Sequence, residues 1–284
     1  MAGEGEGKPD RKPDFTTVDY WDSRFQDEET YDWLVKYSQI RHLIAKYVSK
    51  GDKILMLGCG NSELSAEMYR DGYQNIVNVD FSSVCIDNMR ERHKDFAEME
   101  WLVMDITDLK FPDSSFDVVI EKGTLDALIA NEKDPWYMSD EGLRTMETTL
   151  AKVSQVLKPT GRFISITFSQ PHFRRPLFAK SALNWSIELT LLGEHFHFFF
   201  FAMRKGEPLD PKDSALEKAT LVKREEHEMG CHDDAQMQRL TQDEDEDAFL
   251  SKSTDKAPSS NFHPWFTGVG VVIKPLRDIL QIFA

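Results

Sequence analysis

Two glycines that stand one residue apart, Gly58 and Gly60, follow the mostly apolar run from Lys53 to Leu57. Because glycine has no Cβ, it adopts positive φ readily and lets a ligand approach the main chain closely. A strand, a tight glycine turn and a helix N-terminus would together present free N–H groups to that ligand. The third glycine of the dinucleotide fingerprint G-x-G-x-x-G would fall at Glu63, and no Gly-Lys-Ser/Thr of a P-loop follows. The pattern predicts a ligand-binding loop built for a ligand other than a pyrophosphate.

Acidic residues lie at the ends of the next predicted strands: Asp80 ends the second strand, Asp105 the third, and Glu121 lies at the end of the fourth. Ligands of open α/β sheets bind outside the carboxyl ends of the strands. There Asp80 could accept both hydroxyls of a ribose, while Asp105 and the apolar Ile106 could meet an adenine ring. Each acid alone is more simply a helix N-cap or a solvated charge, but together they predict a nucleoside site. NAD and S-adenosylmethionine both fit such a site, and the missing third glycine disfavours NAD.

The elements that must position these residues alternate along the chain. Continuous apolar strands separated by helices predict an α/β fold, in which helices cover both faces of a parallel sheet. Two more strands, at residues 185–192 and 195–203, are close enough in sequence to form a hairpin that adds an antiparallel strand to the sheet. The earlier strands are predicted at residues 53–57, 75–80, 99–105, 116–123 and 162–168, with a long helix at 139–157 and a turn at 158–161.

The composition divides the chain into four parts. Residues 1–14 are polar and predict a disordered N-terminal lead, and residues 15–205 carry the alternating elements of one domain. Residues 206–260 hold fifteen acidic and seven basic residues, and predict a disordered acidic segment. Residues 261–284 are apolar again, with a role that the sequence does not indicate. They include charged residues and Pro275, so no membrane span is expected.

The net charge of −15 and the pI near 5 limit the possible partners. Direct binding to nucleic acid is not expected, because it needs a basic surface; a basic protein partner is more natural. The three cysteines are irregularly spaced, which indicates a reducing compartment and no metal site. The start of the chain has no apolar signal region, so we expect a cytoplasmic protein, and we expect it to be a monomer.

Nine motifs, in order between residues 18 and 206, resemble the elongation factor 1-alpha lysine methyltransferase 4 family. They are YWDSRF, YDW, LGCGNSELS, VDFSSV, MDI, FDVVIEKGTLDALI, DPW, GRFISITFSQPHFR and FHFFFFAMRKG. The most specific part is EKGTLDAL, which is also similar to the related two-domain methyltransferase-like proteins. The resemblance implies a Rossmann-like seven-stranded methyltransferase sheet over residues 15–205 and S-adenosyl-L-methionine as the cofactor. It also implies that the acceptor is a lysine of elongation factor 1-alpha.

The resemblance also implies a set of residues that contact the cofactor. Gly58 and Gly60 are expected to let the main chain close over the methionine part of the cofactor. Phe25 and Phe81 stand where the family would have tyrosines, so stacking is kept and a hydroxyl contact is lost. The full set is Trp21, Phe25, Trp33, Gly58, Gly60, Asp80, Phe81, Asp105, Ile106 and Lys122.

The acceptor lysine would have to lose its proton before methyl transfer, and an apolar channel would favour that loss by lowering its pKa. Glu121 or Asp126 could position the amine or accept a proton through water, and no metal is expected to take part. Ordinary packing or loop roles are an equally simple interpretation of the aromatic candidates for the channel. Those candidates are Trp21, Trp136, Tyr137, His172 and Phe173.

Two other classes of function stay open at this point. One is a methyltransferase that acts on a small molecule or on a protein N-terminus. The other is an adaptor that keeps the fold without catalysis and binds a partner through its acidic segment. The combination of Gly58, Asp80 and Asp105 argues against the adaptor, which has no need of all three.

Overall fold

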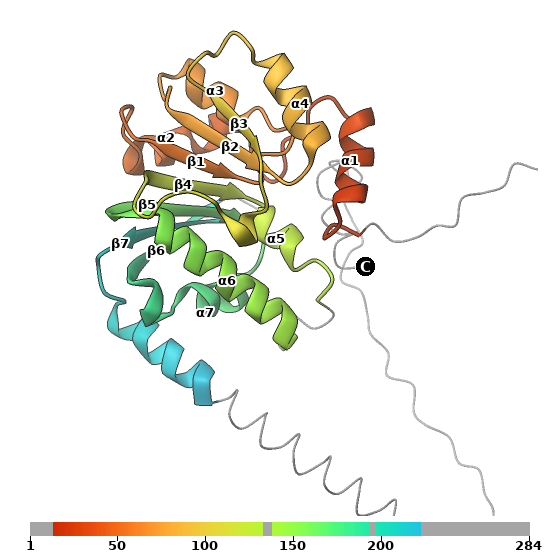
Figure 1. Ribbon diagram of the computed structural model, residues 1–284. Helices are drawn as coiled ribbons and strands as arrows, with labels where there is room; N and C mark the ends of the chain where they lie inside the picture. The colour runs from red at the N-terminus through yellow and green to blue at the C-terminus, as the bar shows by residue number, and fades with distance from the viewer. Residues whose placement is uncertain (1–13, 133–137, 194–196, 223–284) are drawn as a thin grey trace, which may run out of the picture.

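The computed structural model describes residues 14–132, 138–193 and 197–222. These residues build a seven-stranded sheet in the order β3-β2-β1-β4-β5-β7-β6 (Figure 1). The strands are β1 (Ile54–Leu57), β2 (Ile76–Asp80), β3 (Glu100–Val103), β4 (Phe116–Lys122), β5 (Leu157–Thr167), β6 (Trp185–Leu192) and β7 (Phe198–Lys205). The first five strands pair in parallel, and β7 is antiparallel to both β5 and β6. The prediction of an α/β sheet that ends in an antiparallel hairpin is confirmed.

Helices cover both faces of the sheet (Figure 1). They are α1 (Val18–Asp27), α2 (Tyr37–Tyr47), α3 (Leu64–Arg70), α4 (Ser83–Arg92), α5 (Thr124–Leu128), α6 (Asp140–Val156) and α7 (Pro171–Phe178), with short 3-10 helices η1 (Ile106–Asp108) and η2 (Ser181–Leu183). Successive side chains of a strand point to opposite faces. Accordingly, Ile54 and Met56 of β1 pack in one core with helices α1 to α4. Leu55 and Leu57 pack in the other core with α6 and α7.

The segment between α6 and the parallel part of β5 differs from the predicted turn at residues 158–161. The strand already begins at Leu157, which pairs with Phe116, and the next registered pair is Val118 with Arg162. The intervening residues are therefore an irregularity within the strand rather than a turn before it. The Lys-Pro-Thr-Gly composition suggested a turn, and these residues form a bulge between the two registered pairs of β5 with β4.

Part of the segment that we predicted to be acidic and disordered is ordered. Residues 211–222 are helical, directly after β7 (Figure 1). Asp213 in this helix is only 1% exposed, and its carboxylate accepts hydrogen bonds from Arg175 of α7 at 2.5 and 2.9 Å. Leu209 and Leu216 pack against the same core as α6. The prediction of disorder was wrong for these residues. It rested on the acidic composition of the whole segment, whereas a few apolar side chains and one buried ion pair hold this helix on the domain. The rest of the segment, residues 261–284 and most of the N-terminal lead lie outside the described residues.

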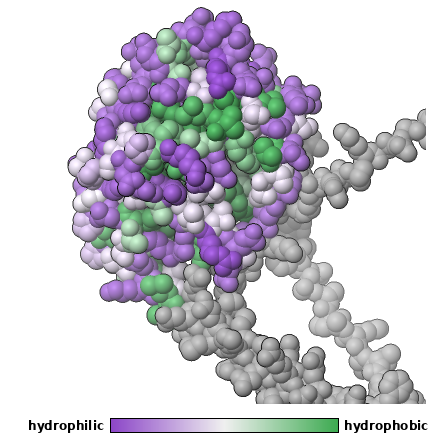
Figure 2. Space-filling view, in the orientation of Figure 1, coloured by the Kyte–Doolittle hydropathy of each residue, from purple (hydrophilic) through white to green (hydrophobic). Residues whose placement is uncertain are grey.

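Much of the visible surface is hydrophilic, with an apolar area in the region of β2 and β3 (Figure 2). Val103, the last residue of β3, is 52% exposed. Among the described residues, no helix is both long enough and apolar enough to cross a membrane.

Candidate active site

A pocket opens at the carboxyl ends of β1, β2 and β4. It is lined by the glycine turn after β1, the residues that follow β2 and β3, and the start of α5. The N-terminal residues before α2 close another side. All ten residues that the family resemblance implies for the cofactor lie along this pocket: Trp21, Phe25, Trp33, Gly58, Gly60, Asp80, Phe81, Asp105, Ile106 and Lys122.

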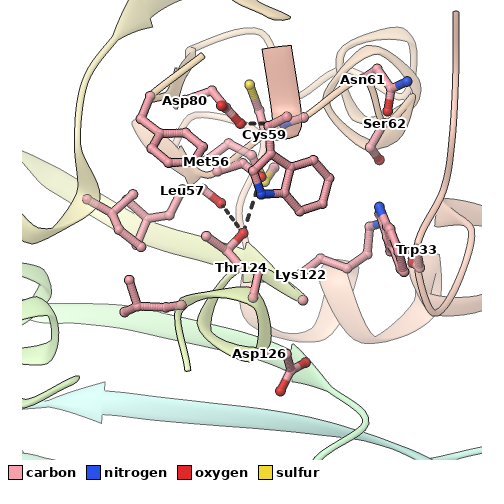
Figure 3. Close-up of a pocket in the computed structure, with 18 of the residues that line it drawn as sticks. Trp33, Met56, Leu57, Cys59, Asn61, Ser62, Asp80, Lys122, Thr124 and Asp126 are labelled. Atoms are coloured by element: carbon pink, nitrogen blue, oxygen red, sulfur yellow. Dashed lines mark hydrogen bonds between the residues drawn. The ribbon is translucent and has the colours of Figure 1, made fainter. Parts of the chain in front are cut away.

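The glycine turn has the backbone geometry that its composition predicts. Gly58 and Gly60 have φ of +55° and +52°. A Cβ on Gly58 would lie 2.3 Å from Cγ2 of Thr124, so a larger residue is excluded there by α5. The Thr124 hydroxyl lies 2.9 Å from the Leu57 carbonyl oxygen and 3.2 Å from that of Gly58 (Figure 3). Gly58 is therefore needed to seat α5 against the turn, a packing reason that the sequence did not reveal.

Asp80 connects the glycine turn to the end of β2. Its Oδ2 accepts a hydrogen bond from the Gly60 N–H at 3.0 Å, and its Oδ1 accepts one from the Ser82 N–H at 3.0 Å. The side chain is 5% exposed, and burial raises the pKa of its carboxyl to about 6. A carboxylate oxygen has room for more than one hydrogen bond. Asp80 is thus held in place by main-chain donors and can still accept hydroxyls of a ligand.

The residues after β3 line the pocket near Asp80 with the apolar side chain of Ile106 and the carboxylate of Asp105. Oδ1 of Asp105 accepts hydrogen bonds from the N–H and the hydroxyl of Thr107, both at 2.8 Å. Ile106 is buried, while Phe81 after β2 is partly exposed, and both line the pocket. The predicted pairing of an acid with apolar side chains for a ring is therefore present in space as well as in sequence.

Aromatic side chains of the N-terminal segment close the pocket from the side of α1. Trp21 stacks on Phe25 with ring centroids 5.5 Å apart, and its edge faces Trp33 at 6.2 Å. Two hydrogen bonds hold the segment in place. The hydroxyl of Ser82, the N-cap of α4, donates to Asp22, and the Asn88 side chain in α4 donates to the Phe25 carbonyl at 3.0 Å.

Lys122 at the end of β4 fastens the same segment from the other side. Its Nζ donates to the Trp33 carbonyl at 2.8 Å and lies 3.7 Å from a carboxylate oxygen of Asp32. Asp32 also accepts from the Ser62 hydroxyl at 2.5 Å, which connects it to the glycine turn. Burial lowers the pKa of Lys122 to about 8, and the nearby Asp32 carboxylate acts in the opposite direction.

The two acids that we considered for proton transfer have different surroundings. Glu121 is fully buried and does not line the pocket. Its carboxylate accepts a hydrogen bond from the Ser165 hydroxyl. It also accepts hydrogen bonds from the N–H of Thr124 at 3.0 Å and from the N–H of Leu125 at 3.2 Å. Burial, and then the charge of Asp126, raise the pKa of Glu121 to about 7. Glu121 therefore supports the start of α5 from beneath.

Asp126, in the first turn of α5, does line the pocket, although it is only 4% exposed. Its Oδ1 accepts from the Thr167 hydroxyl at 2.6 Å and from the guanidinium of Arg174. Its Oδ2 has no hydrogen-bond partner within the described residues. In Figure 3, Asp126 lies beyond Thr124 and Lys122 on the side away from Asp80. The pocket thus has acids at two separate ends.

The predicted acceptor channel is only partly found. Trp21 lines the pocket, whereas His172 and Phe173 lie on α7 outside it, with their rings 3.9 Å apart. Trp136 and Tyr137 lie outside the described residues. Sequence reasoning missed Phe15, Tyr31, Leu128 and Phe168, which line the pocket instead. Phe168 directly follows Thr167, the partner of Asp126, so its position next to a strand end was the available signal.

Cys59, between the two glycines, lies beside Cys85 and Asp80, with their ligand-type atoms within 4.8 Å of one another. Burial raises the pKa of the Cys59 thiol well above its ordinary value. A protonated, buried thiol is a poor nucleophile and a poor metal ligand. Cys59 is thus a small buried residue of the glycine turn.

The arrangement fits a nucleoside ligand at the Asp80 end. It offers a fixed carboxylate for vicinal hydroxyls and apolar side chains beside a ring. It also offers a backbone turn in which Gly58 and Gly60 have no side chain. The Asp126 end offers a carboxylate oxygen without a partner among the described residues, suited to a cationic or hydrogen-bond-donating group.

Comparisons with known proteins identify the family of this chain. Residues 48–197 match a family model described as a methyltransferase domain. The chain is 39% identical to EEF1A lysine methyltransferase 4 of Mus musculus over 246 residues, which are 86% of this chain and 93% of that protein. It is 40% identical over 167 residues to eEF1A lysine and N-terminal methyltransferase of Bos taurus, covering 58% of this chain and 23% of that protein. A methyltransferase structure from Aquifex aeolicus overlaps 64% of this chain and 97% of its own, with a TM-score of 0.49 and 14% identity.

Proposed function

The chain belongs to the methyltransferase family that includes EEF1A lysine methyltransferase 4, and from this premise we propose that it methylates a lysine of elongation factor 1-alpha. The family resemblance of the sequence is confirmed, and the protein is an S-adenosylmethionine-dependent methyltransferase. The observation that carries the choice of acceptor is the extent of the match. The alignment spans 93% of a relative named for lysine methylation of EEF1A, and not the catalytic core alone.

In this proposal the Asp80 end of the pocket holds the cofactor. Asp80 accepts the ribose hydroxyls, and its bonds to the Gly60 and Ser82 N–H groups keep it in position. Phe81 and Ile106 flank the adenine, with Asp105 near its amino group. When bound, S-adenosyl-L-methionine supplies a methyl group on a positively charged sulfur, which makes that methyl reactive towards an amine.

The Asp126 end receives the acceptor. A lysine side chain has a pKa near 10.4 in water, so only a small fraction is neutral at pH 7. Apolar side chains such as Leu128 and Phe168 remove water around the amine and favour the neutral form. The lysine enters as an ammonium ion that pairs with the Asp126 carboxylate, and it releases one proton to water before methyl transfer. The neutral amine then donates a hydrogen bond to the same carboxylate, which orients it, and the enzyme gains rate mainly by alignment. Glu121 takes no direct part and supports α5.

Purified enzyme incubated with cofactor and purified elongation factor 1-alpha tests the proposal. We expect mass spectrometry to find a methylated lysine in the elongation factor, and no such product with the Asp80→Asn variant. Methylation of its N-terminus alone would favour the second activity named for the Bos taurus relative. Absence of any methylated residue in the elongation factor would overturn the proposed acceptor. Since this factor acts in translation, the proposal includes a cytoplasmic location.

A further inference from the structure

Helix α7 is joined to the acceptor end of the pocket by a buried ion pair. Arg174 of α7 is 1% exposed, and its Nη2 donates to Oδ1 of Asp126 on α5. The Thr167 hydroxyl, at the end of β5, donates to the same Oδ1 at 2.6 Å. Donors from two elements, β5 and α7, thus fix one oxygen of Asp126 on α5.

The remaining polar atoms of this pair are unusual. Oδ2 of Asp126 and both Nε and Nη1 of Arg174 are buried and have no hydrogen-bond partner within the described residues. Native proteins leave few buried polar atoms without a partner, and each exception calls for an explanation. Asp126 lines the pocket and Arg174 does not, so the carboxylate is the member of this pair that borders the pocket.

The charges of the cluster indicate which ligand would suit it. Two acids, Glu121 and Asp126, are buried here with one cation, Arg174. Glu121 is bonded to Ser165 and to the start of α5, so it offers no oxygen to the pocket. When both acids are ionised, one negative charge is unbalanced. A buried charge is tolerated when it is paired, and an ammonium group that enters the pocket would pair with it.

We propose that Arg174 is a positioning residue of the acceptor site, which holds Oδ1 of Asp126 so that Oδ2 faces the ammonium group of the incoming lysine. This inference rests on the proposed function. The only side-chain hydrogen bond of Arg174 within the described residues goes to Asp126, so the direct link from Arg174 to the pocket is that carboxylate.

The adjacent arginine provides a matched control. Arg175 lies on the same helix and also pairs with an aspartate, Asp213, by two hydrogen bonds of 2.5 and 2.9 Å. This pair lies away from the pocket, between α7 and the helix at residues 211–222. A substitution there changes the packing of α7 without touching Asp126.

The test is a double-mutant cycle of Arg174→Lys and Asp126→Asn with purified elongation factor as acceptor. Lysine keeps the charge but lacks the planar fork of arginine, so the carboxylate loses its fixed orientation. We expect each single variant to lower kcat/KM for the acceptor on the order of ten- to a hundredfold, since small misplacements cost that much. The double variant should be no worse than Asp126→Asn alone. Binding of S-adenosylhomocysteine, measured by calorimetry, should change less than about twofold, because the nucleoside end is untouched.

Arg175→Lys should leave kcat/KM for the acceptor unchanged. The inference is overturned if the effects of Arg174→Lys and Asp126→Asn simply multiply in the double variant. It is also overturned if Arg174→Lys weakens cofactor binding as much as it slows the reaction. If the wild-type enzyme labels a different acceptor, the proposed function fails, and the same cycle measured with that acceptor still decides the role of Arg174.

Discussion

At the scale of single residues, Asp80 is the side chain on which the nucleoside end of the pocket depends. Asp80→Asn keeps the size of the side chain and one acceptor oxygen but removes the charge. A hydrogen bond to a charged group contributes about 1.5–3 kcal/mol, which corresponds to roughly a ten- to a hundredfold loss of affinity. We therefore expect a loss of this size for S-adenosylhomocysteine in calorimetry. An unchanged affinity would show that Asp80 holds the loop and does not bind the ribose.

Glu121 predicts a dependence of stability on pH. Its pKa is raised from an ordinary 4.5 to about 7, so the folded protein binds this proton more tightly than the unfolded chain does. The resulting stabilisation is fully present below pH 4.5 and is lost as the pH rises through 7. A shift of this size corresponds to about 3 kcal/mol.

Glu121→Gln isolates this effect, because glutamine has a similar shape and does not titrate. Denaturant unfolding of both proteins at pH 5 and pH 8 measures it. We expect the wild type to lose stability relative to Glu121→Gln over this range. A constant difference between the two proteins would mean that Glu121 is already ionised at pH 5. We also expect this variant to slow turnover less than Asp126→Asn, because Glu121 does not reach the pocket.

At the scale of elements, the helix at residues 211–222 is expected to be part of the folded domain. Asp213→Ala removes the partner of Arg175 and leaves a buried site empty. Such a loss typically costs about 1–3 kcal/mol, and each kcal/mol lowers Tm by roughly 2–4 °C in a domain of this size. Thermal unfolding should show a lower Tm with unchanged cofactor affinity. If Tm stays the same, the ion pair does not hold this helix.

The sequence predicted the elements whose signals are local. The apolar runs of β1, β2 and β4 could be recognised because buried parallel strands are continuously apolar. Asp80 and Asp105 could be placed together because parallel strands end at one edge of the sheet. Ser82 is the N-cap of α4, and its hydroxyl accepts from the Cys85 N–H at 3.0 Å; serine before a helix is a local signal of the same kind.

What the sequence could not predict depends on contacts between distant elements. The EKGTLDAL motif contains Glu121 and Asp126, but spacing does not tell which of them faces the pocket. That choice depends on two contacts between distant residues: Ser165 on β5 donates a hydrogen bond to Glu121, and Arg174 on α7 donates one to Asp126. Likewise, a glycine turn was expected at Gly58, but the exclusion of a Cβ there by Thr124 could be seen only from the packing of α5.

At the scale of the whole molecule, the net charge of −15 predicts how the enzyme meets its acceptor. Opposite charges speed the encounter of two proteins, and salt screens this attraction, with a Debye length of about 10 Å at 0.1 M. We expect kcat/KM for the elongation factor to fall as salt is raised from 0.05 to 0.5 M. The affinity for S-adenosylhomocysteine should change much less over this range. Equal sensitivity of both quantities would argue against electrostatic attraction of a basic acceptor.

An unbiased labelling experiment identifies the acceptor without assuming it. Purified enzyme is incubated with S-adenosylmethionine that carries a labelled methyl group and with a cytosolic extract, with Asp80→Asn as the control. The labelled products are then identified by mass spectrometry. We expect one main labelled protein, elongation factor 1-alpha, with the label on a lysine. Label on a metabolite or on a protein N-terminus, with every lysine of the elongation factor unlabelled, would contradict it.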